Sequence, residues 1–245
     1  MSELLKEETK THKTGLTVDE ERTFLDYLQY KVKFKRWYPL FLLLFRTGIR
    51  IGEALALTWD DVDFKNSILS ISKTVSYFYH TEEGVHKFEV HPPKSEAGRR
   101  KIPMTPELKE VLFQFKQDSR VLKDTFKPEN KKFENYIFRS CTGCVLAEGN
   151  INMTIKRIIL GCNDDIMSGK FNGTILPPFT CHITRHTFAT RINEAGVNIK
   201  TAQKILGHAH FTTTMDIYTA IADSFVIQEL NSYADYVWGY RKPEN

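Results

Sequence analysis

The sequence predicts an α+β fold, a mostly helical domain with a small antiparallel sheet of about three strands. Amphipathic stretches with helix-capping residues recur along the chain, at residues 17–47, 106–121, 151–160 and 183–206. Residues 67–103 instead alternate β-branched and aromatic residues with polar ones, which is typical of short strands. With 245 residues, 41% of them hydrophobic, the chain is long enough to bury a substantial core.

Three helices are expected to open the fold. Residues 1–15 are polar and are predicted to form a flexible leader. Thr17 and Glu20 form a capping-box sequence ahead of an amphipathic stretch, so the first helix is expected to begin there. A second helix is predicted over residues 38–47, ending at Gly48, and a third, short helix carries the segment RIGEALAL.

The middle of the chain is expected to supply the sheet. Four segments have strand character, namely ILSIS, TVSYFY, VHKFEV and RKIPM, with turns at EEG and SEAG. A helix is then predicted from Pro106 toward Val121, a charged loop over residues 123–135 and a short strand at YIF. INMTIKRIIL is expected to be helical, and residues 163–180 to form a long loop.

The last part is expected to return to helices. ITRHTFATRINEA is closed by Gly196 and IKTAQKIL by Gly207. A helical turn at TTTMDIY and a final helix near SFVIQELNSYADYV follow. Residues 16–222 are therefore expected to form one domain, and residues 223–245 a C-terminal helix and tail.

Composition excludes several classes of protein. The 34 Lys and Arg residues against 30 Asp and Glu residues give a net charge of only +4. A positively charged binding surface therefore requires that the Lys and Arg side chains cluster on one face of the protein. No run approaches the about 20 apolar residues of a membrane span, and no signal peptide is present, so a cytoplasmic location is expected. The pairs Cys141/Cys144 and His182/His186 lie too far apart for a zinc finger, which leaves a zinc-stabilised interaction module as a weak alternative.

Charged and polar residues at helical spacing are the candidate functional residues. Arg50 and Glu53 are three apart, on one face of a short helix among apolar residues, and form either a structural ion pair or part of an anion site. His182 and Arg185 have the same spacing at the start of a helix, whose free N–H groups favour anions. His186 and Arg191 on this helix are further candidates for binding the same anion, and capping or solvation is the alternative for each.

Basic residues also flank a turn. Lys94 precedes SEAG, and Arg99, Arg100 and Lys101 follow it. They form either a solvated basic turn or a tip that follows the sugar-phosphate backbone of a nucleic acid and brings one lysine into a site. Further along, His208 directly follows Gly207, and Tyr218 comes after a run of threonines, with His210 expected in the loop between them.

Taken in order, R-x-x-E, a hairpin lysine, H-x-x-R-H, L-G-H and D-I-Y resemble the tyrosine recombinase (phage integrase) family, with particular similarity to integrases of conjugative transposons. The resemblance covers about residues 16–236. It implies the catalytic-domain fold of that family and site-specific DNA recombination as the activity.

The resemblance also assigns roles around a scissile phosphate. Arg50 and Arg185 would grip the phosphate, because a planar guanidinium matches its oxygens and stays charged. His208 would add a hydrogen bond to a non-bridging oxygen. Glu53 would orient Arg50 or a histidine of the site. Arg99, Arg100 and Lys101 would contact DNA.

The remaining roles concern bond breaking. Tyr218 would attack phosphorus to form a 3′-phosphotyrosine, with His182 as general base and Lys94 as general acid for the departing 5′ oxygen. A phenol has a pKa of about 10 and therefore needs a nearby base or a strong positive field. These cationic donors would replace metal ions, so no metal, ATP or other cofactor is expected.

The implied partners are double-stranded DNA at transposon ends and target sites, and Holliday junctions. Self-association into a dimer or tetramer on DNA is expected through the C-terminal helix, and an excisionase is a candidate accessory protein; no membrane partner is expected. Two departures from the family pattern stand out: Thr184 replaces a commonly apolar residue, and the short leader suggests that an N-terminal DNA-clamping domain has been trimmed away. A type IB-like topoisomerase and a non-catalytic DNA-binding protein of this fold are the alternatives.

Overall fold

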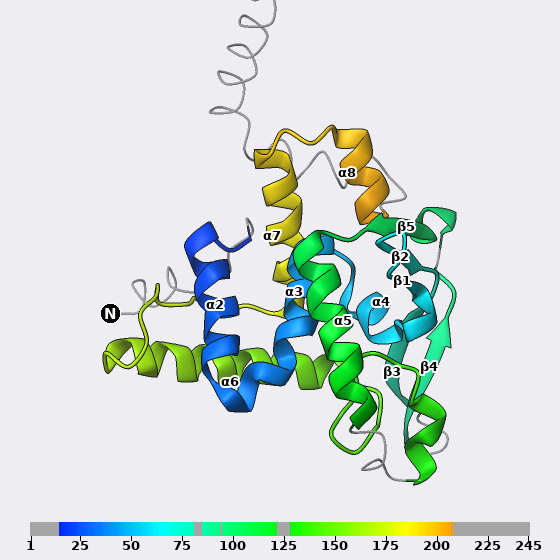
Figure 1. Cartoon of the computed structure of the whole chain (residues 1–245), viewed down its shortest axis with the longest axis horizontal. Coiled ribbons are helices and arrows are strands. Elements are labelled where there is room, and N and C mark those ends of the chain that lie inside the picture. Colours follow the sequence, from blue (N-terminus) through cyan, green and yellow to red (C-terminus); the bar gives the residue numbers. More distant parts are fainter. Residues whose placement is uncertain (1–14, 81–84, 94, 122–127, 208–245) are drawn as a thin grey trace, which may run out of the picture.

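The structure, a computed structural model, describes residues 15–80, 85–93, 95–121 and 128–207. Its α-helices are α2 (Val18–Tyr30), α3 (Tyr38–Thr47), α4 (Ile51–Ala56), α5 (Pro106–Val121), α6 (Glu148–Met167), α7 (Cys181–Glu194) and α8 (Ile199–Leu206). The 3-10 helices are η1 (Val32–Trp37), η2 (Trp59–Asp61), η3 (Glu96–Gly98) and η5 (Pro128–Phe133). The strands are β1 (Val62–Asp63), β2 (Ile68–Ile71), β3 (Thr74–His80), β4 (Val85–His91) and β5 (Arg100–Pro103). The predicted mostly helical α+β fold is confirmed, and the strands lie on the side of the molecule opposite α2 (Figure 1).

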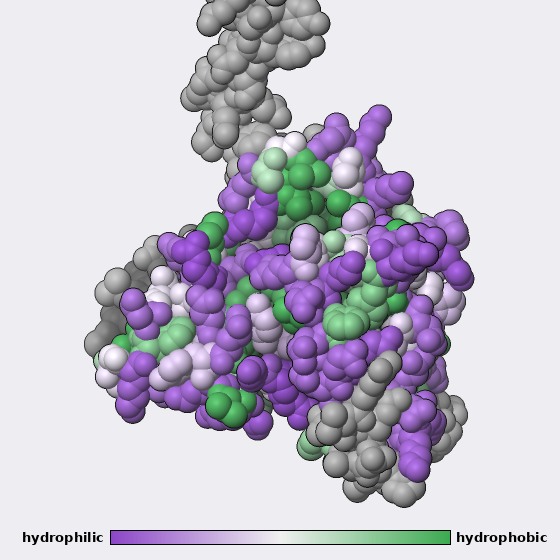
Figure 2. All heavy atoms as spheres, in the orientation of Figure 1, coloured by the Kyte–Doolittle hydropathy of each residue, from purple (hydrophilic) through white to green (hydrophobic). Residues whose placement is uncertain are grey.

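The outer face is mostly hydrophilic, with small apolar patches (Figure 2). One patch lies where α7 and α8 meet (Figure 2). Beneath it, Phe188, Ala189 and Leu206 form a small buried cluster, against which the partly buried Ile192 and Ile205 pack. Within the described part of the chain, no helix is long and apolar enough to cross a membrane.

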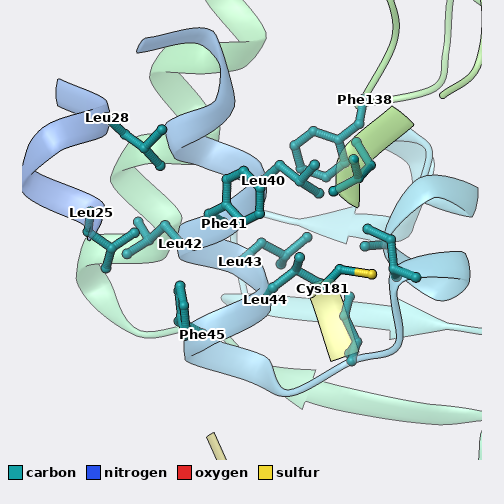
Figure 3. Close-up of a cluster of buried hydrophobic side chains, with 14 of the residues drawn as sticks. Leu25, Leu28, Leu40, Phe41, Leu42, Leu43, Leu44, Phe45, Phe138 and Cys181 are labelled. Carbon is teal, nitrogen blue, oxygen red and sulfur yellow. The ribbon is translucent and has the colours of Figure 1, made fainter. Parts of the chain in front are cut away.

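Helix α3 is the centre of the hydrophobic core. All residues from Pro39 to Phe45 are buried, as expected for a helix that is apolar on every side. Figure 3 shows side chains of α2, including Leu25 and Leu28, on one side of α3, and Phe138 and Cys181 on another. The first helix also starts as predicted: the Glu20 N–H donates to Thr17 Oγ1 (3.2 Å), and the Thr17 N–H to Glu20 Oε2 (2.7 Å).

Gly48 ends α3 and turns the chain toward α4. Its φ of 62° lies in the left-handed region, and its N–H donates to the Leu44 carbonyl. A Cβ atom at this position would overlap the ring of Phe188 and touch Leu206. The predicted stop is therefore confirmed, and the packing adds a second reason for glycine that the sequence did not reveal.

We expect Gly48→Ala to destabilise the fold by about 2 to 5 kcal/mol, the sum of left-handed strain and overpacking. Gly196→Ala is the matched control, because Gly196 has a φ of 69° but no atom within 4 Å of an added Cβ. The control should cost only about 1 to 2 kcal/mol from strain. Urea unfolding of both variants measures the difference, and equal losses would show that contact with Phe188 is unimportant.

The strands form two antiparallel sheets rather than one. A three-stranded sheet has the order β1-β2-β5, with Leu69 opposite Ile102 and Ile71 opposite Arg100. The hairpin β3-β4 forms a separate two-stranded sheet. All four predicted strand segments are confirmed, but RKIPM pairs with ILSIS instead of the hairpin, and the two-residue β1 was not predicted.

Two local predictions after α5 need correction. Helix α6 runs to Met167, so the expected loop starts five residues later than residue 163. Asp165, near the end of this helix, accepts hydrogen bonds from Tyr27 and Lys31 of α2 and the following turn, which anchors the extra turn through tertiary contacts. The predicted strand at YIF is only an isolated bridge between Tyr136 and Thr58. Helices α7 and α8 and their Gly196 and Gly207 ends agree with prediction.

Candidate active site

Arg50 stands at the start of α4, two residues after the Gly48 turn. Its backbone N–H donates to Glu53 Oε2 (2.9 Å), and its Nη1 to Glu53 Oε1 (3.3 Å). The Arg50 side chain is 48% exposed, whereas that of Glu53 is 4% exposed. The turn and the carboxylate thus fix the base of Arg50 while its guanidinium remains open to solvent.

Arg185 lies in α7 with only 6% of its surface exposed. Its Nη1 donates to the Gly48 carbonyl and its Nη2 to the Leu206 carbonyl, both at 2.7 Å. Among the described residues, no carboxylate lies within ion-pair distance of this guanidinium. Within the described part of the chain, Arg185 is therefore a buried cation that is held by two carbonyl groups.

The charge of Arg185 is costly in this setting. Burial lowers its pKa to about 9, with the charges of Arg50 and Arg100 acting in the same direction and Glu53 opposing them. It remains protonated at neutral pH, so among the described residues Arg50, Arg100 and Arg185 bring three positive charges around the carboxylate of Glu53. A bound anion would compensate the excess charge.

His182 is exposed at the first turn of α7, one turn ahead of His186. Their rings meet edge to face, with centroids 4.7 Å apart. Burial, followed by His182 and Arg185, lowers the pKa of half-buried His186, so this imidazole is neutral near pH 7. His182, Arg185 and His186 therefore share one face of α7, as their spacing predicts.

Other candidates on α7 behave differently. Arg191 pairs with Glu194 and donates to the Leu16 carbonyl, so it does not join the Arg50–Arg185 group. Thr184 is fully buried, and its hydroxyl donates to the Cys181 carbonyl at 2.7 Å. The departure from an apolar residue at this position thus leaves no unpaired hydroxyl.

Arg100 differs from its expected place on a solvated basic turn. It is 8% exposed, and its Nη1 and Nη2 donate to the two carboxylate oxygens of Glu53 at 3.0 and 2.8 Å. Its Nε donates to the Ile205 carbonyl at 2.6 Å. The reason is strand alternation, because Arg100 and Ile102 point inward while Lys101 points outward. Arg100 is therefore not part of a solvated basic turn, and the apolar Ile102 two residues on was the available signal.

Arg99 and Lys101 do lie on the surface, beside a groove between β5 and α8 with a volume of about 710 Å³. Lys200 and Lys204 of α8 line the same groove. Four cations and the neighbouring Ser70 and Ser72 hydroxyls suit a polyanionic backbone. The two lysines of α8 were missed from the sequence, because nothing local shows that α8 packs beside β5.

Three predicted site residues, Lys94, His208 and Tyr218, lie outside the described residues, as do the leader, His210 and the C-terminal helix. Of the predicted catalytic and supporting residues that are described, Arg50, Glu53 and Arg185 interact with one another, and His182 lies on the helix of Arg185. Over the part of the chain that the structure describes, no group of three or more His, Cys, Asp or Glu side chains could hold a metal ion.

Comparison with known proteins identifies relatives of this chain. The model of the phage integrase family matches residues 15–224. The transposase from transposon Tn916 of Enterococcus faecalis is 31% identical over 210 residues, covering 84% of this chain and 47% of the transposase. A tyrosine recombinase XerC-like protein of Caldanaerobacter subterraneus is 30% identical over 208 residues, covering 83% of this chain and 49% of that protein.

Solved structures of related proteins have a similar fold. The Tn1549 transposon integrase, solved in complex with circular intermediate DNA, superposes with a TM-score of 0.75 at 27% identity, covering 92% of this chain and 68% of that one. XerA recombinase gives a TM-score of 0.61 at 25% identity, covering 96% of this chain and 66% of that one. The chain spans about half the length of the curated relatives that it matches. From its fold, its clustered arginines and these matches, the chain belongs to the phage integrase family.

Proposed function

We propose that the protein is a site-specific DNA recombinase of a transposon, which cleaves and rejoins strands through a 3′-phosphotyrosine intermediate and a Holliday junction. The observation that carries this proposal is the group of Arg50 and Arg185, two interacting guanidinium groups whose charge exceeds that of Glu53, the one carboxylate beside them among the described residues. A phosphodiester between them would supply the missing negative charge. The similarity to Tn916 transposase and Tn1549 integrase supports transposon DNA as the substrate.

In the proposed reaction, the Tyr218 oxygen forms a bond to phosphorus as the bond to the 5′ oxygen breaks. His182, which is exposed on the face of Arg185, takes the phenolic proton. Lys94 gives a proton to the departing 5′ oxygen, and His208 donates to a non-bridging oxygen. Attack of a 5′-hydroxyl on the phosphotyrosine reverses these steps, so rejoining uses the stored bond energy.

Charge stabilisation in this mechanism comes from fixed side chains. Each positioned donor on the developing negative charge is worth about 10² to 10³ in rate, and an acid or base about 10² to 10⁴. Arginines at 50 and 185, with the histidines and Lys94, therefore supply enough stabilisation to act without a metal ion or ATP. The reported relatives are transposases and recombinases, which favours exchange between duplexes over relaxation by a topoisomerase.

Assembly and location are part of the same proposal. We infer that subunits associate as a dimer or tetramer on DNA through residues 223–245, that an excisionase is a candidate accessory partner, and that the reaction takes place in the cytoplasm. Residues 16–222 would form the catalytic domain. Exchange between two duplexes needs four cleavages, which four active sites supply.

The decisive test is to trap the covalent intermediate. The substrates are duplexes made from the DNA that flanks the gene, with a nick a few nucleotides from the cleavage site. Cleavage then releases a short fragment that carries the 5′-hydroxyl, and its loss prevents religation. The full chain should form an adduct that survives denaturing electrophoresis in the presence of EDTA. An adduct that forms only after magnesium is added, or none on any of these duplexes, would overturn the proposal.

Arg99 and Lys101 are the proposed contacts to the DNA backbone. We expect the double variant Arg99→Gln/Lys101→Gln to reduce the salt dependence of DNA binding. The slope of the logarithm of the binding constant against the logarithm of the salt concentration should become smaller in magnitude by about 0.9 for each lost phosphate contact. Lys156→Gln/Arg157→Gln on the exposed face of α6 removes the same charge away from the groove and should leave the slope nearly unchanged. Affinity titrations at several salt concentrations measure this, and equal slopes for the two variants would rule out the groove as the contact.

A further inference from the structure

The C-terminal end of α8 is held by two arginines from other elements. The last carbonyls of a helix lack partners within the helix and carry its partial negative charge. Here the Leu206 carbonyl accepts from Arg185 (2.7 Å), and the Ile205 carbonyl from Arg100 (2.6 Å). Two cations thus cap two successive carbonyls at the point where the chain leaves α8.

Arg100 joins this helix end to the base of Arg50. Its guanidinium binds both oxygens of Glu53, and the same oxygens accept from the backbone and side chain of Arg50. The side chains of Arg100 and Glu53 are 3% and 4% exposed, so solvent does not compete for these bonds. A continuous buried chain of contacts therefore runs from α8 through Arg100 and Glu53 to Arg50.

Gly207 packs directly on the Arg100 guanidinium. A Cβ atom at Gly207 would lie 2.8 Å from Arg100 Nη1 and 3.0 Å from its Cζ, and Gly207 has a φ of 67°. The next residue in the sequence is His208. The position of Arg100 consequently sets where the chain departs toward His208.

We propose that Arg100 is a positioning residue, which holds the Gly207 end of α8 at a fixed distance from Arg50 so that both sides of the phosphate site are aligned. This inference rests on the proposed recombinase function. It predicts that Arg100 never touches DNA but is needed for cleavage. The Nε, Nη1 and Nη2 groups of one planar guanidinium donate to the Glu53 carboxylate and the Ile205 carbonyl at the same time. A lysine ammonium has one nitrogen and cannot reach both acceptors in this geometry.

The test compares single-turnover cleavage of a nicked duplex, at saturating DNA, with DNA affinity and thermal unfolding. Arg100→Lys keeps the positive charge but loses the planar guanidinium that binds both acceptors. A misplacement of catalytic groups by about 1 Å costs about 10² in rate. We expect cleavage to fall by about that factor while DNA affinity stays nearly unchanged. Arg46→Lys is the matched control: Arg46 also binds two carboxylates, those of Glu21 and Glu107, and lies outside the site.

A second variant guards against misfolding. Arg100→Gln removes the guanidinium altogether, leaves Glu53 its hydrogen bonds from the backbone and side chain of Arg50, and should show at least a comparable loss of cleavage. Cleavage by either folded variant at the rate of Arg46→Lys would overturn the proposal. So would failure of both to fold where Arg46→Lys is native, because Arg100 would then be structural. If the unmodified protein forms no adduct, the recombinase function itself fails.

Discussion

Tyr218→Phe is expected to abolish the covalent protein–DNA adduct while leaving DNA affinity nearly intact. The substitution removes one oxygen atom, and that oxygen is the proposed nucleophile. Without it the remaining cationic groups can still bind the phosphate, but no bond from the protein to phosphorus can form. The measurement is adduct formation on a nicked duplex, alongside a binding titration at the same salt concentration.

Tyr30→Phe provides the matched control for this prediction. Tyr30 on α2 is half exposed, and its hydroxyl donates to the Lys170 carbonyl, so the same oxygen is removed far along the sequence from the proposed site. This variant should form the adduct at the normal rate. Persistence of the adduct in Tyr218→Phe would assign the nucleophile to another residue, and loss in both variants would point to a general effect on folding.

Arg185→Gln is expected to lower the cleavage rate by at least about 10² to 10³, the usual effect of removing one charged donor from a transition state. The stability of the fold should also fall. Removal of Arg185 relieves the cost of burying an unpaired cation, but the glutamine side chain is too short to replace both hydrogen bonds to the Gly48 and Leu206 carbonyls. We therefore expect a loss of about 1 to 3 kcal/mol, the cost of an unsatisfied buried carbonyl.

Arg191→Gln on the same helix tests whether the effect is local. Arg191 contacts Glu194 and the Leu16 carbonyl, so its loss should affect stability and leave cleavage unchanged. Single-turnover cleavage and urea unfolding of both variants separate the two quantities. If Arg185→Gln cleaved as fast as Arg191→Gln, Arg185 would not bind the scissile phosphate.

These two predictions imply that the site is built at a cost in stability. Three guanidinium groups surround one carboxylate, and burial lowers the pKa of Arg185 to about 9. Burial alone would raise the pKa of Glu53, but the hydrogen bonds and charge of Arg100, together with Arg50, outweigh it and lower that pKa. Glu53 thus contributes stability above its unfolded-state pKa that is lost as the pH falls through the lower folded-state value.

Helix starts and stops were predictable because their signals are local. The Thr17–Glu20 capping box and the glycines at 48, 196 and 207 act within a few residues of themselves, and all lie where they were expected. Strand pairing was less predictable. The sequence does not show that residues 100–103 leave the hairpin and pair with Ile68–Ile71, because pairing depends on how the chain between them folds back.

The candidate site shows the same division. The chemistry was readable from the order of R-x-x-E, H-x-x-R-H and L-G-H, and helical spacing placed His182, Arg185 and His186 on one face. The role of Arg100 could not be predicted from the sequence. Its neighbours Arg99 and Lys101 are exposed, so charge and composition alone made the three alike.

By itself, the sequence determined the fold class, the helix ends at Gly48, Gly196 and Gly207, and the family that its motifs resemble. The set of reactive groups stays a prediction. Only the tertiary structure decided which of the cations face solvent and which are buried against Glu53, and that the end of α8 lies beside them. Arg100 and Ile205 are 105 residues apart, and so are not neighbours until the sheet and α8 pack together. Whether an arginine binds DNA or holds a helix in place depends on that packing, since burial and a paired carboxylate commit most of the donors of Arg100 to the protein itself.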